Sequence, residues 1–149
     1  MDQIEVRLAV QTDTPAWLEM RLRLWPNHTR QEMLDEMTPM LADEASTPVF
    51  IAFSKNGNAI GFLEGGLRKY ADGCSTSPVG YIEGWYVDEP WRKQGVGAAL
   101  VANFEQWCLK KGLREIGSDT WLDNQASIEA HQKLGYTVSE RLVHFVKKL

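Results

Sequence analysis

The sequence predicts a mixed α/β domain in which strands and helices alternate. Three observations indicate this class: strand-like apolar stretches, amphipathic helical stretches between them, and turns rich in Gly, Pro or Asn at the junctions. The expected order is β-α-α-β-β-β-α-β-α-β. Because the chain has 149 residues, no internal repeat and no linker-like tract, residues 1–149 are expected to form one domain with a sizeable core.

The first half of the chain is expected to supply a strand, two helices and a hairpin. These elements are expected at residues 4–10, 15–25, 31–42, 49–54 and 59–67. Thr14 suits a helix N-cap, Pro15 suits the first helical position, and Pro26 ends that helix. Asn56-Gly57 is typical of the turn between two paired strands.

The second half is expected to supply three strands and two helices. These elements are expected at residues 80–87, 96–111, 114–120, 124–135 and 139–149. Val96, Leu100, Phe104 and Trp107 recur at helical spacing, and Gly112 provides a stop for their helix. The last element, "SERLVHFVKKL", is expected to be the final strand.

Composition and charge argue against several classes of protein. A net charge of −4 disfavours nucleic-acid binding, which normally needs a basic face, and suits a cationic small molecule better. No apolar run reaches the roughly 20 residues that span a membrane, and no secretory leader is visible, so a cytoplasmic location is expected. Cys74 and Cys108 are isolated from each other and from any histidine pair, so no metal site is expected.

The stretch "WRKQGVGAAL" (residues 91–100) places a basic run and two glycines before a helix. Gly95 and Gly97 lack the third glycine of the dinucleotide fingerprint, and the NTPase phosphate-loop pattern is absent. An anion site is still indicated, because first-turn N–H groups, the helix dipole, Arg92 and Lys93 all favour negative charge. A tight helix entry with no ligand is the structural alternative.

Two motifs resemble signatures of the GNAT-type N-acyltransferase superfamily. "EGWYVDEPWRKQGVGAALV" is similar to the first, with Arg92, Gly95 and Gly97 at its fixed positions. "NQASIEAHQKLGY" is similar to the second, and its matching positions are Asn124, Ser127, Gly135 and Tyr136. The resemblance implies the GNAT fold: a mixed, mostly antiparallel sheet flanked by helices and splayed at the two central strands.

The resemblance also implies acetyl-CoA as the donor. The residues that would hold its pyrophosphate are Arg92, Lys93, Gln94, Gly95, Val96, Gly97 and Ala98. The backbone of Trp85, Tyr86 and Val87 would pair with the pantetheine arm, and Asn124 would contact the cofactor. His131 stands where many relatives have a tyrosine that faces the thiol, and both a hydrogen bond to the leaving thiolate and a packing role remain open.

Two acids point to the acceptor. An alkylamine with a pKa of ~10.4 costs about 4.6 kcal/mol to deprotonate at pH 7, and a carboxylate can accept that proton directly or through water. Glu83 lies inside a predicted strand, where a charge is costly unless paired. Asp119 lies at the carboxyl end of the next strand, where open α/β sheets bind ligands. The alternatives are a partly exposed strand position or a structural ion pair for Glu83, and a helix or turn cap for Asp119.

Further stretches narrow the resemblance to the aminoglycoside 6′-N-acetyltransferases. They are "LRLWPNH", "YADGCSTSPVGYIEGWYV" and "SDTWLDNQAS". This resemblance implies a homodimer involved in antibiotic resistance, with an acceptor site formed by Trp25, Tyr70, Glu83, Asp119 and Glu140.

The implied reaction is direct attack in a ternary complex. The N–H of Val87 would polarise the thioester carbonyl, and Glu83 or Asp119 would steer the amine. Two alternatives remain: an acetyltransferase for a polyamine or protein amine, and a non-catalytic acyl-CoA-binding module.

Overall fold

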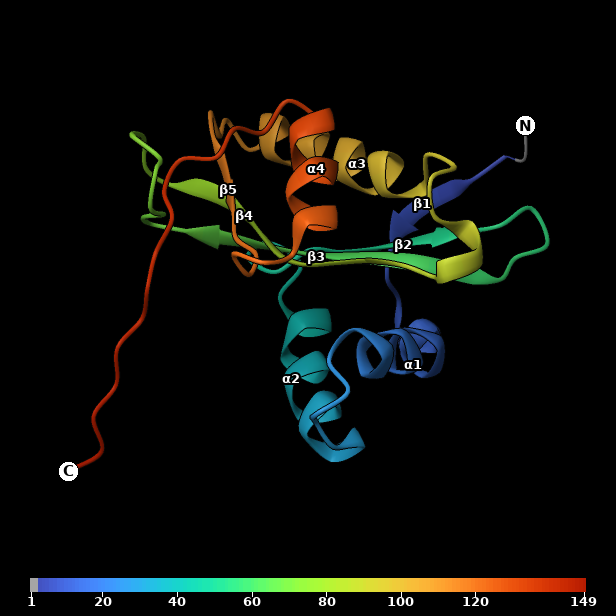
Figure 1. The fold of residues 1–149 in the computed structure, drawn as a ribbon. Helices are drawn as coiled ribbons and strands as arrows, with labels where there is room; N and C mark the ends of the chain where they lie inside the picture. Colours follow the sequence, from blue (N-terminus) through green and yellow to red (C-terminus); the bar gives the residue numbers. More distant parts are fainter. Residues whose placement is uncertain (1–2) are drawn as a thin grey trace.

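The computed structural model describes residues 3–149 and contains a five-stranded sheet between two layers of helices (Figure 1). Its elements are β1 (Glu5–Leu8), η1 (Gln11–Asp13), α1 (Thr14–Leu24), α2 (Arg30–Ala42), β2 (Val49–Phe53), β3 (Ala59–Arg68), β4 (Val79–Val87), η2 (Glu89–Trp91), α3 (Val96–Lys110), β5 (Ile116–Ser118) and α4 (Gln125–Lys133). Strands β1 to β4 are successively antiparallel, and β5 runs parallel to β4. The predicted mixed, mostly antiparallel sheet with flanking helices is confirmed. Between residues 3 and 149, no helix has the length and apolar character needed to cross a membrane.

Each face of the sheet carries its own hydrophobic core. Helices α3 and α4 lie over one face, and α1 and α2 lie over the other (Figure 1). The predicted apolar stripe of α3 is buried: Val96, Leu100 and Phe104 pack with sheet residues such as Leu63. On the opposite face the core is built from Trp17, Met20, Met33, Met37, Ile51 and Phe62. Both faces of the sheet are therefore covered, which leaves its edges as the accessible backbone.

A buried ion pair ties α1 to the centre of the sheet. The Arg21 guanidinium donates to both carboxylate oxygens of Glu64 on β3, with Nε 2.7 Å and Nη2 3.2 Å away. The Trp17 indole donates to the same carboxylate at 2.9 Å, and Nη2 of Arg21 also reaches Glu36 on α2 at 3.0 Å. Burial raises the pKa of the Glu64 carboxyl, and the hydrogen bonds from Arg21 and Trp17 offset part of that rise. This network fixes the α1/α2 layer over β3.

Strand β4 carries a β-bulge on the side that faces β3. Glu64 pairs with Gly84 and the next residue, Gly65, pairs with Ile82, so Glu83 is an extra residue in β4. As a result, Glu83 and Gly84 both face the α1/α2 layer, although consecutive strand residues normally point to opposite faces.

Strand β4 separates from β5 immediately before the bulge. The two strands pair in parallel only where residues 80–82 lie opposite residues 116–118. From residue 83 to residue 87, β4 has no strand partner on that side within the described chain. A wedge-shaped opening therefore exposes one backbone edge of β4, which is the expected splay between parallel strands.

A predicted helix cap and a predicted strand differ from the structure. The N-cap of α1 is Asp13 rather than Thr14, which is the first residue of the helix. The strand predicted over residues 139–149 is wrong, because the described residues 137–149 contain no helix or strand. Their apolar pattern is typical of a strand, but a strand forms only where a neighbouring backbone pairs with it, and this segment leaves the body of the domain (Figure 1).

Replacing Glu64 should lower the stability of the fold far more than replacing Glu83, a glutamate in the exposed part of the sheet. Glu64→Gln leaves the buried Arg21 charge without its main partner, so we expect the free energy of unfolding to fall by about 3 kcal/mol. The measurement is urea unfolding followed by tryptophan fluorescence at pH 7 and a fixed protein concentration. Glu83→Gln is the matched control; it breaks an exposed pair and should cost less than about 1 kcal/mol. Equal losses would show that the Arg21–Glu64 pair does not hold α1 to the sheet.

Candidate active site

The turn before α3 is built from residues with left-handed backbone conformations. Lys93 has φ of 63° and Gly95 has φ of 87°. A positive φ is ordinary for glycine but costly for lysine, and such strain is typical of functional turns. Gly95 is the N-cap of α3, and it has no side chain that could accept from the first-turn N–H groups. These N–H groups point out of the helix and favour an anion.

The second glycine of this turn serves packing inside the protein. A Cβ on Gly97 would come 3.1 Å from the Trp85 ring, and the Trp85 indole donates to the Gly97 carbonyl at 3.2 Å. Arg92 donates from Nε to the Val87 carbonyl at 2.8 Å, and Gln94 donates to the Pro90 carbonyl at 2.9 Å. Of the other predicted donor-site residues, the Val96 side chain is buried in the core and Ala98 is exposed. Hydrogen bonds within the protein thus hold the turn in place, while the N–H groups of the first turn of α3 point outward.

The open edge of β4 presents backbone groups to the wedge. The Asp88 N–H donates to Ile60 of β3 at 2.8 Å. Because N–H directions alternate along a strand, the N–H groups of Trp85 and Val87 point away from β3, toward the opening. The backbone N–H of Tyr86 instead points toward β3. The buried phenol of Tyr86 donates to the Asp88 carboxylate at 2.9 Å.

His131 lies on α4 and packs edge-on against Trp85, with 5.1 Å between ring centroids. Its Nδ1 lies 2.7 Å from the Ser127 carbonyl, which can only accept, so Nδ1 carries the proton in the neutral ring. Its Nε2 lies 2.7 Å from the Ser118 hydroxyl at the end of β5, and therefore accepts from it. Asn124 is the N-cap of the same helix and accepts from the Ser127 N–H at 3.1 Å.

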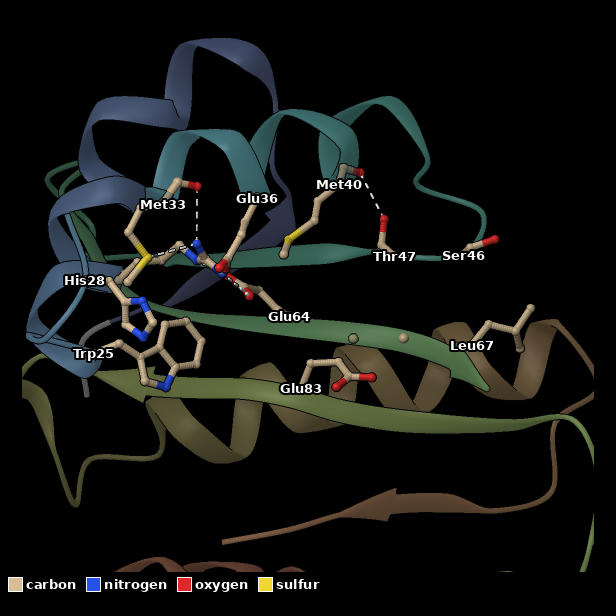
Figure 2. Close-up of a pocket in the computed structure, with 13 residues that line it drawn as sticks. Trp25, His28, Met33, Glu36, Met40, Ser46, Thr47, Glu64, Leu67 and Glu83 are labelled. Carbon is tan, nitrogen blue, oxygen red and sulfur yellow. Dashed lines mark hydrogen bonds and ion pairs between the residues drawn. The ribbon is translucent and has the colours of Figure 1, made fainter. Parts of the chain in front are cut away.

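A cavity of about 480 Å³ lies on the α1/α2 side of the sheet, beside the bulge. Its lining includes Arg21, Trp25, His28, Glu36, Glu64 and Glu83. Figure 2 shows the Trp25 ring and the Glu83 carboxylate on the same side of the sheet, facing the space under α2. The sequence predicted Trp25 and Glu83 together, whereas the buried Arg21–Glu64 pair and Glu36 were missed. Counting Arg68, which pairs with Glu83, three carboxylates stand against two guanidiniums, so these groups leave one net negative charge at the cavity.

Glu83 is held in place by a partner from the neighbouring strand. Arg68 on β3 donates to both carboxylate oxygens, at 2.9 Å from Nε and 2.6 Å from Nη2. Gly66 makes this possible, because a Cβ there would come 2.6 Å from the Glu83 carboxylate. The hydrogen bond to Glu83 raises the pKa of Arg68. An ion pair, the structural alternative for Glu83, is therefore present at the edge of the cavity.

Asp119 is linked to the same arginine by Tyr81, which contacts both residues. The Tyr81 phenol donates to Asp119, and the Arg68 guanidinium carbon lies 3.5 Å from the Tyr81 ring centroid. Burial, together with the bond to Asp119, raises the pKa of Tyr81 well above its usual value. Glu83 and Asp119 are thus joined by a chain of contacts through Arg68 and Tyr81, two residues that the sequence interpretation missed.

Tyr70 and Glu140 lie outside this cavity lining. Tyr70 is 81% exposed in the loop between β3 and β4. Glu140 is exposed at the start of the C-terminal segment, next to Ser139, which packs closely against Gly73 of the same loop. The contact between Ser139 and Gly73 brings the start of this segment to the loop that carries Tyr70.

The two cysteines are free, and Cys108 is buried in the core. Burial raises the pKa of the Cys108 thiol to about 12, so it stays protonated and poorly nucleophilic at neutral pH. Cys74 is half-buried, and burial also raises its pKa. Within residues 3–149 no group of three or more His, Cys, Asp or Glu residues is placed to hold a metal ion.

Comparison with known proteins gives matches along nearly the whole chain. Residues 14–136 match the acetyltransferase (GNAT) family. The chain is 42% identical over 146 residues to the aminoglycoside N(6')-acetyltransferase type 1 of Klebsiella aerogenes, covering 97% of this chain and 96% of that protein. It is 40% identical to the protein of the same name from Stenotrophomonas maltophilia, with coverages of 94% and 90%.

Solved structures give the same picture. The chain superposes on AAC(6')-Iy in complex with the bisubstrate analogue CoA-S-monomethyl-acetylneamine with a TM-score of 0.92 at 34% identity, covering 99% of both chains. A structure of AAC(6')-Iy in complex with CoA gives a TM-score of 0.93 at 33% identity, covering 100% of this chain and 97% of that one.

The tautomer of His131 is directly measurable. We expect the neutral ring to carry its proton on Nδ1, because the Ser127 carbonyl accepts only from a protonated nitrogen. Long-range ¹H–¹⁵N correlation spectra at neutral pH distinguish the two tautomers, and His131→Gln assigns the signals. Ser118→Ala should leave the proton on Nδ1, because the Ser127 carbonyl remains. A neutral ring protonated on Nε2 would contradict this hydrogen-bond pattern.

Proposed function

The chain belongs to the GNAT family of acetyltransferases, and from this premise we propose that it transfers an acetyl group from acetyl-CoA to the 6′-amino group of aminoglycoside antibiotics. The observation that carries the acceptor class is the acid-lined cavity at the bulge, where Trp25 and Glu83 face one space. Acetylation at this amine would confer aminoglycoside resistance. We propose that residues 1–149 act as one catalytic domain and that the protein is a homodimer. We also propose that it works in the cytoplasm, where acetyl-CoA is made.

The donor would occupy the side of the sheet where positive charge and open N–H groups lie. The turn from Arg92 to Ala98 would hold the pyrophosphate, with its strained Lys93 and outward first-turn N–H groups as the cradle. The pantetheine arm would then lie along the unpaired edge of β4, where Trp85 and Val87 present their N–H groups. Asn124 would meet the cofactor from the start of α4, with its amide NH₂ group, because its oxygen already caps the helix.

The acceptor would occupy the α1/α2 side. An aminoglycoside carries several ammonium groups on linked rings, and the partly exposed carboxylates of Glu36 and Glu83 would face them, while Glu64 stays buried against Arg21. The Arg21 guanidinium lies 4.9 Å from the Trp25 ring centroid, and the rest of this ring would offer an apolar surface to one sugar ring. We place Tyr70, Asp119 and Glu140 around the outer rings, since the loop and the chain segment that carry them meet at Gly73 and Ser139.

The transfer would proceed by direct attack of the neutral amine on the thioester carbonyl. The N–H of Val87 would stabilise the negative charge that develops on the carbonyl oxygen. Glu83 or Asp119 would take the proton from the amine, directly or through water. The C–S bond would then break, and the thiolate would take a proton from the hydrogen-bonded pair of Ser118 and His131. A cysteine acyl-enzyme is disfavoured, because Cys108 is buried in the core and burial raises the pKa of both thiols.

Thiol release from acetyl-CoA separates the candidate acceptors. The purified protein is given tobramycin, spermidine or a lysine peptide in parallel, and free CoA is measured with a thiol reagent. We expect rapid release with tobramycin, and mass spectrometry should locate the acetyl group on the 6′-nitrogen. Release with spermidine or the peptide alone would favour a polyamine or protein acetyltransferase. No release with any acceptor, together with tight acetyl-CoA binding, would favour a non-catalytic binding module.

The two acids are separated by paired substitutions. We expect Asp119→Asn to lower kcat/KM for tobramycin on the order of 100-fold while the dissociation constant for acetyl-CoA changes by less than about threefold. Glu83→Gln is measured beside it, and Glu44→Gln, an exposed acid outside the cavity lining, is the control. The variant that loses the acidic limb of the pH–rate profile has lost the base. An equal loss of turnover and acetyl-CoA binding would contradict an acceptor-side role for Asp119.

A further inference from the structure

The loop between β3 and β4, residues 69–78, carries the proposed acceptor residue Tyr70 and joins the two strands at one end of the sheet (Figure 1). It contains no helix or strand of its own, and the Tyr70 side chain is 81% exposed. A side chain on such a loop keeps a fixed direction only if contacts from outside the loop hold its backbone. The place of Tyr70 in the acceptor site therefore depends on what holds this loop.

Glu115, the residue immediately before β5, holds the second half of the loop. One oxygen of its carboxylate accepts from the backbone N–H groups of Ser75 and Thr76, at 2.8 Å and 2.7 Å. The same oxygen accepts from the Thr76 hydroxyl at 2.5 Å. These hydrogen bonds, that of the Thr76 hydroxyl first, lower the pKa of the Glu115 carboxyl, so it is charged at neutral pH. A charged acceptor that binds two successive N–H groups is a strong and directional clamp on the loop.

The backbone of Glu115 is itself fixed to the sheet. Its carbonyl accepts from the Gly80 N–H of β4 at 3.0 Å, and the next residue, Ile116, pairs with Gly80 in the ladder between β4 and β5. The main chain of Glu115 is therefore anchored to the sheet while its side chain is anchored to the loop. The loop consequently takes its position from the pairing of β4 with β5.

The first half of the loop packs against β5. A Cβ on Gly117 would come 3.1 Å from the Ala71 side chain and 3.0 Å from the Tyr81 ring, so the glycine allows both to approach the strand. Ala71 follows Tyr70 in the chain, and Tyr81 donates to Asp119 just beyond the end of β5. The strand that Glu115 ties to the loop therefore also sets the place of Tyr70 relative to Asp119.

We propose that Glu115 is a positioning residue for the acceptor: it holds residues 69–78 against β5 and so fixes Tyr70 where the outer rings of an aminoglycoside bind. The inference rests on the acceptor proposed above and deepens it by naming the residue that shapes the outer part of its site. Glu115 acts through the loop and does not touch the acceptor. It is half-buried, and neither it nor residues 69–78 belong to either hydrophobic core, so its loss should release the loop and leave the domain folded.

Steady-state kinetics of the full chain test the effect on the acceptor. We expect Glu115→Ala to raise KM for tobramycin on the order of 10-fold while kcat and the dissociation constant for acetyl-CoA change by less than about twofold, because only acceptor binding is lost. Glu115→Gln keeps an oxygen that can accept from the same groups and should restore most of the KM. Glu5→Ala removes an exposed acid from β1, the opposite edge strand, and should leave KM unchanged. A fall in kcat at unchanged KM would overturn the positioning role.

Limited proteolysis reads the clamp without any substrate. Lys69 is exposed at the start of the loop, and trypsin should cut after it faster in Glu115→Ala than in the unmodified protein or Glu5→Ala, at an unchanged thermal unfolding temperature. Thr76→Val removes one donor of the clamp and should raise both the cleavage rate and KM by a smaller factor. Adding it to Glu115→Ala should cause no further change, because both substitutions break the same contact.

The two readouts separate the inference from the function on which it rests. Equal cleavage rates in all variants would overturn the clamp, and faster cleavage with an unchanged KM would overturn its role in acceptor binding. If the unmodified protein releases no thiol with tobramycin, the proposed function is contradicted, whereas the cleavage rates still report whether Glu115 holds the loop.

Discussion

Strand β4 cannot be a regular strand, and the rest of the candidate site depends on this constraint. Its bulge residue, Glu83, has no ladder position, so its carboxylate is available to the cavity and is held by Arg68 instead. The bulge also turns Gly84 toward the α1/α2 layer, where a Cβ would come 2.7 Å from the Trp25 ring. Only a glycine at this point allows Trp25 to lie against the sheet. One irregular residue therefore places both an acid and an aromatic ring beside the opening between β4 and β5.

Local features of the site were predictable from the sequence, and features that depend on register were not. The glycine turn is a contiguous pattern, so Gly95 and its helix could be located directly. Glu83 was noticed because a charge inside a strand needs a partner, but that partner, Arg68, is identified only by the pairing of β3 with β4. Arg21 and Glu64 are 43 positions apart in the sequence and resemble two surface charges until the helix is docked on the sheet.

The C-terminal segment shows a different limit of sequence interpretation. Its pattern indicates that residues 139–149 are suited to be a strand, and this propensity is a property of the residues themselves. Where the strand pairs is a property of the available edges, and the described chain supplies no pairing for it. The predicted strand is therefore wrong because no neighbouring backbone pairs with residues 139–149 in the described chain, which the pattern of the segment alone does not reveal.

The same sheet separates the two chemical roles that the proposed reaction needs. On the α1/α2 face, Glu83 is one of the two carboxylates, with Asp119, that we propose to accept the proton that the amine must lose. On the α3/α4 face, the Nδ1–H of His131 donates to the Ser127 carbonyl and Nε2 accepts from the Ser118 hydroxyl. We propose that this Ser118–His131 pair lies on the side from which the leaving thiolate takes its proton. Base and acid would thus lie on opposite faces of β4, with the reacting carbonyl at the strand edge between them, which is the arrangement that direct transfer requires.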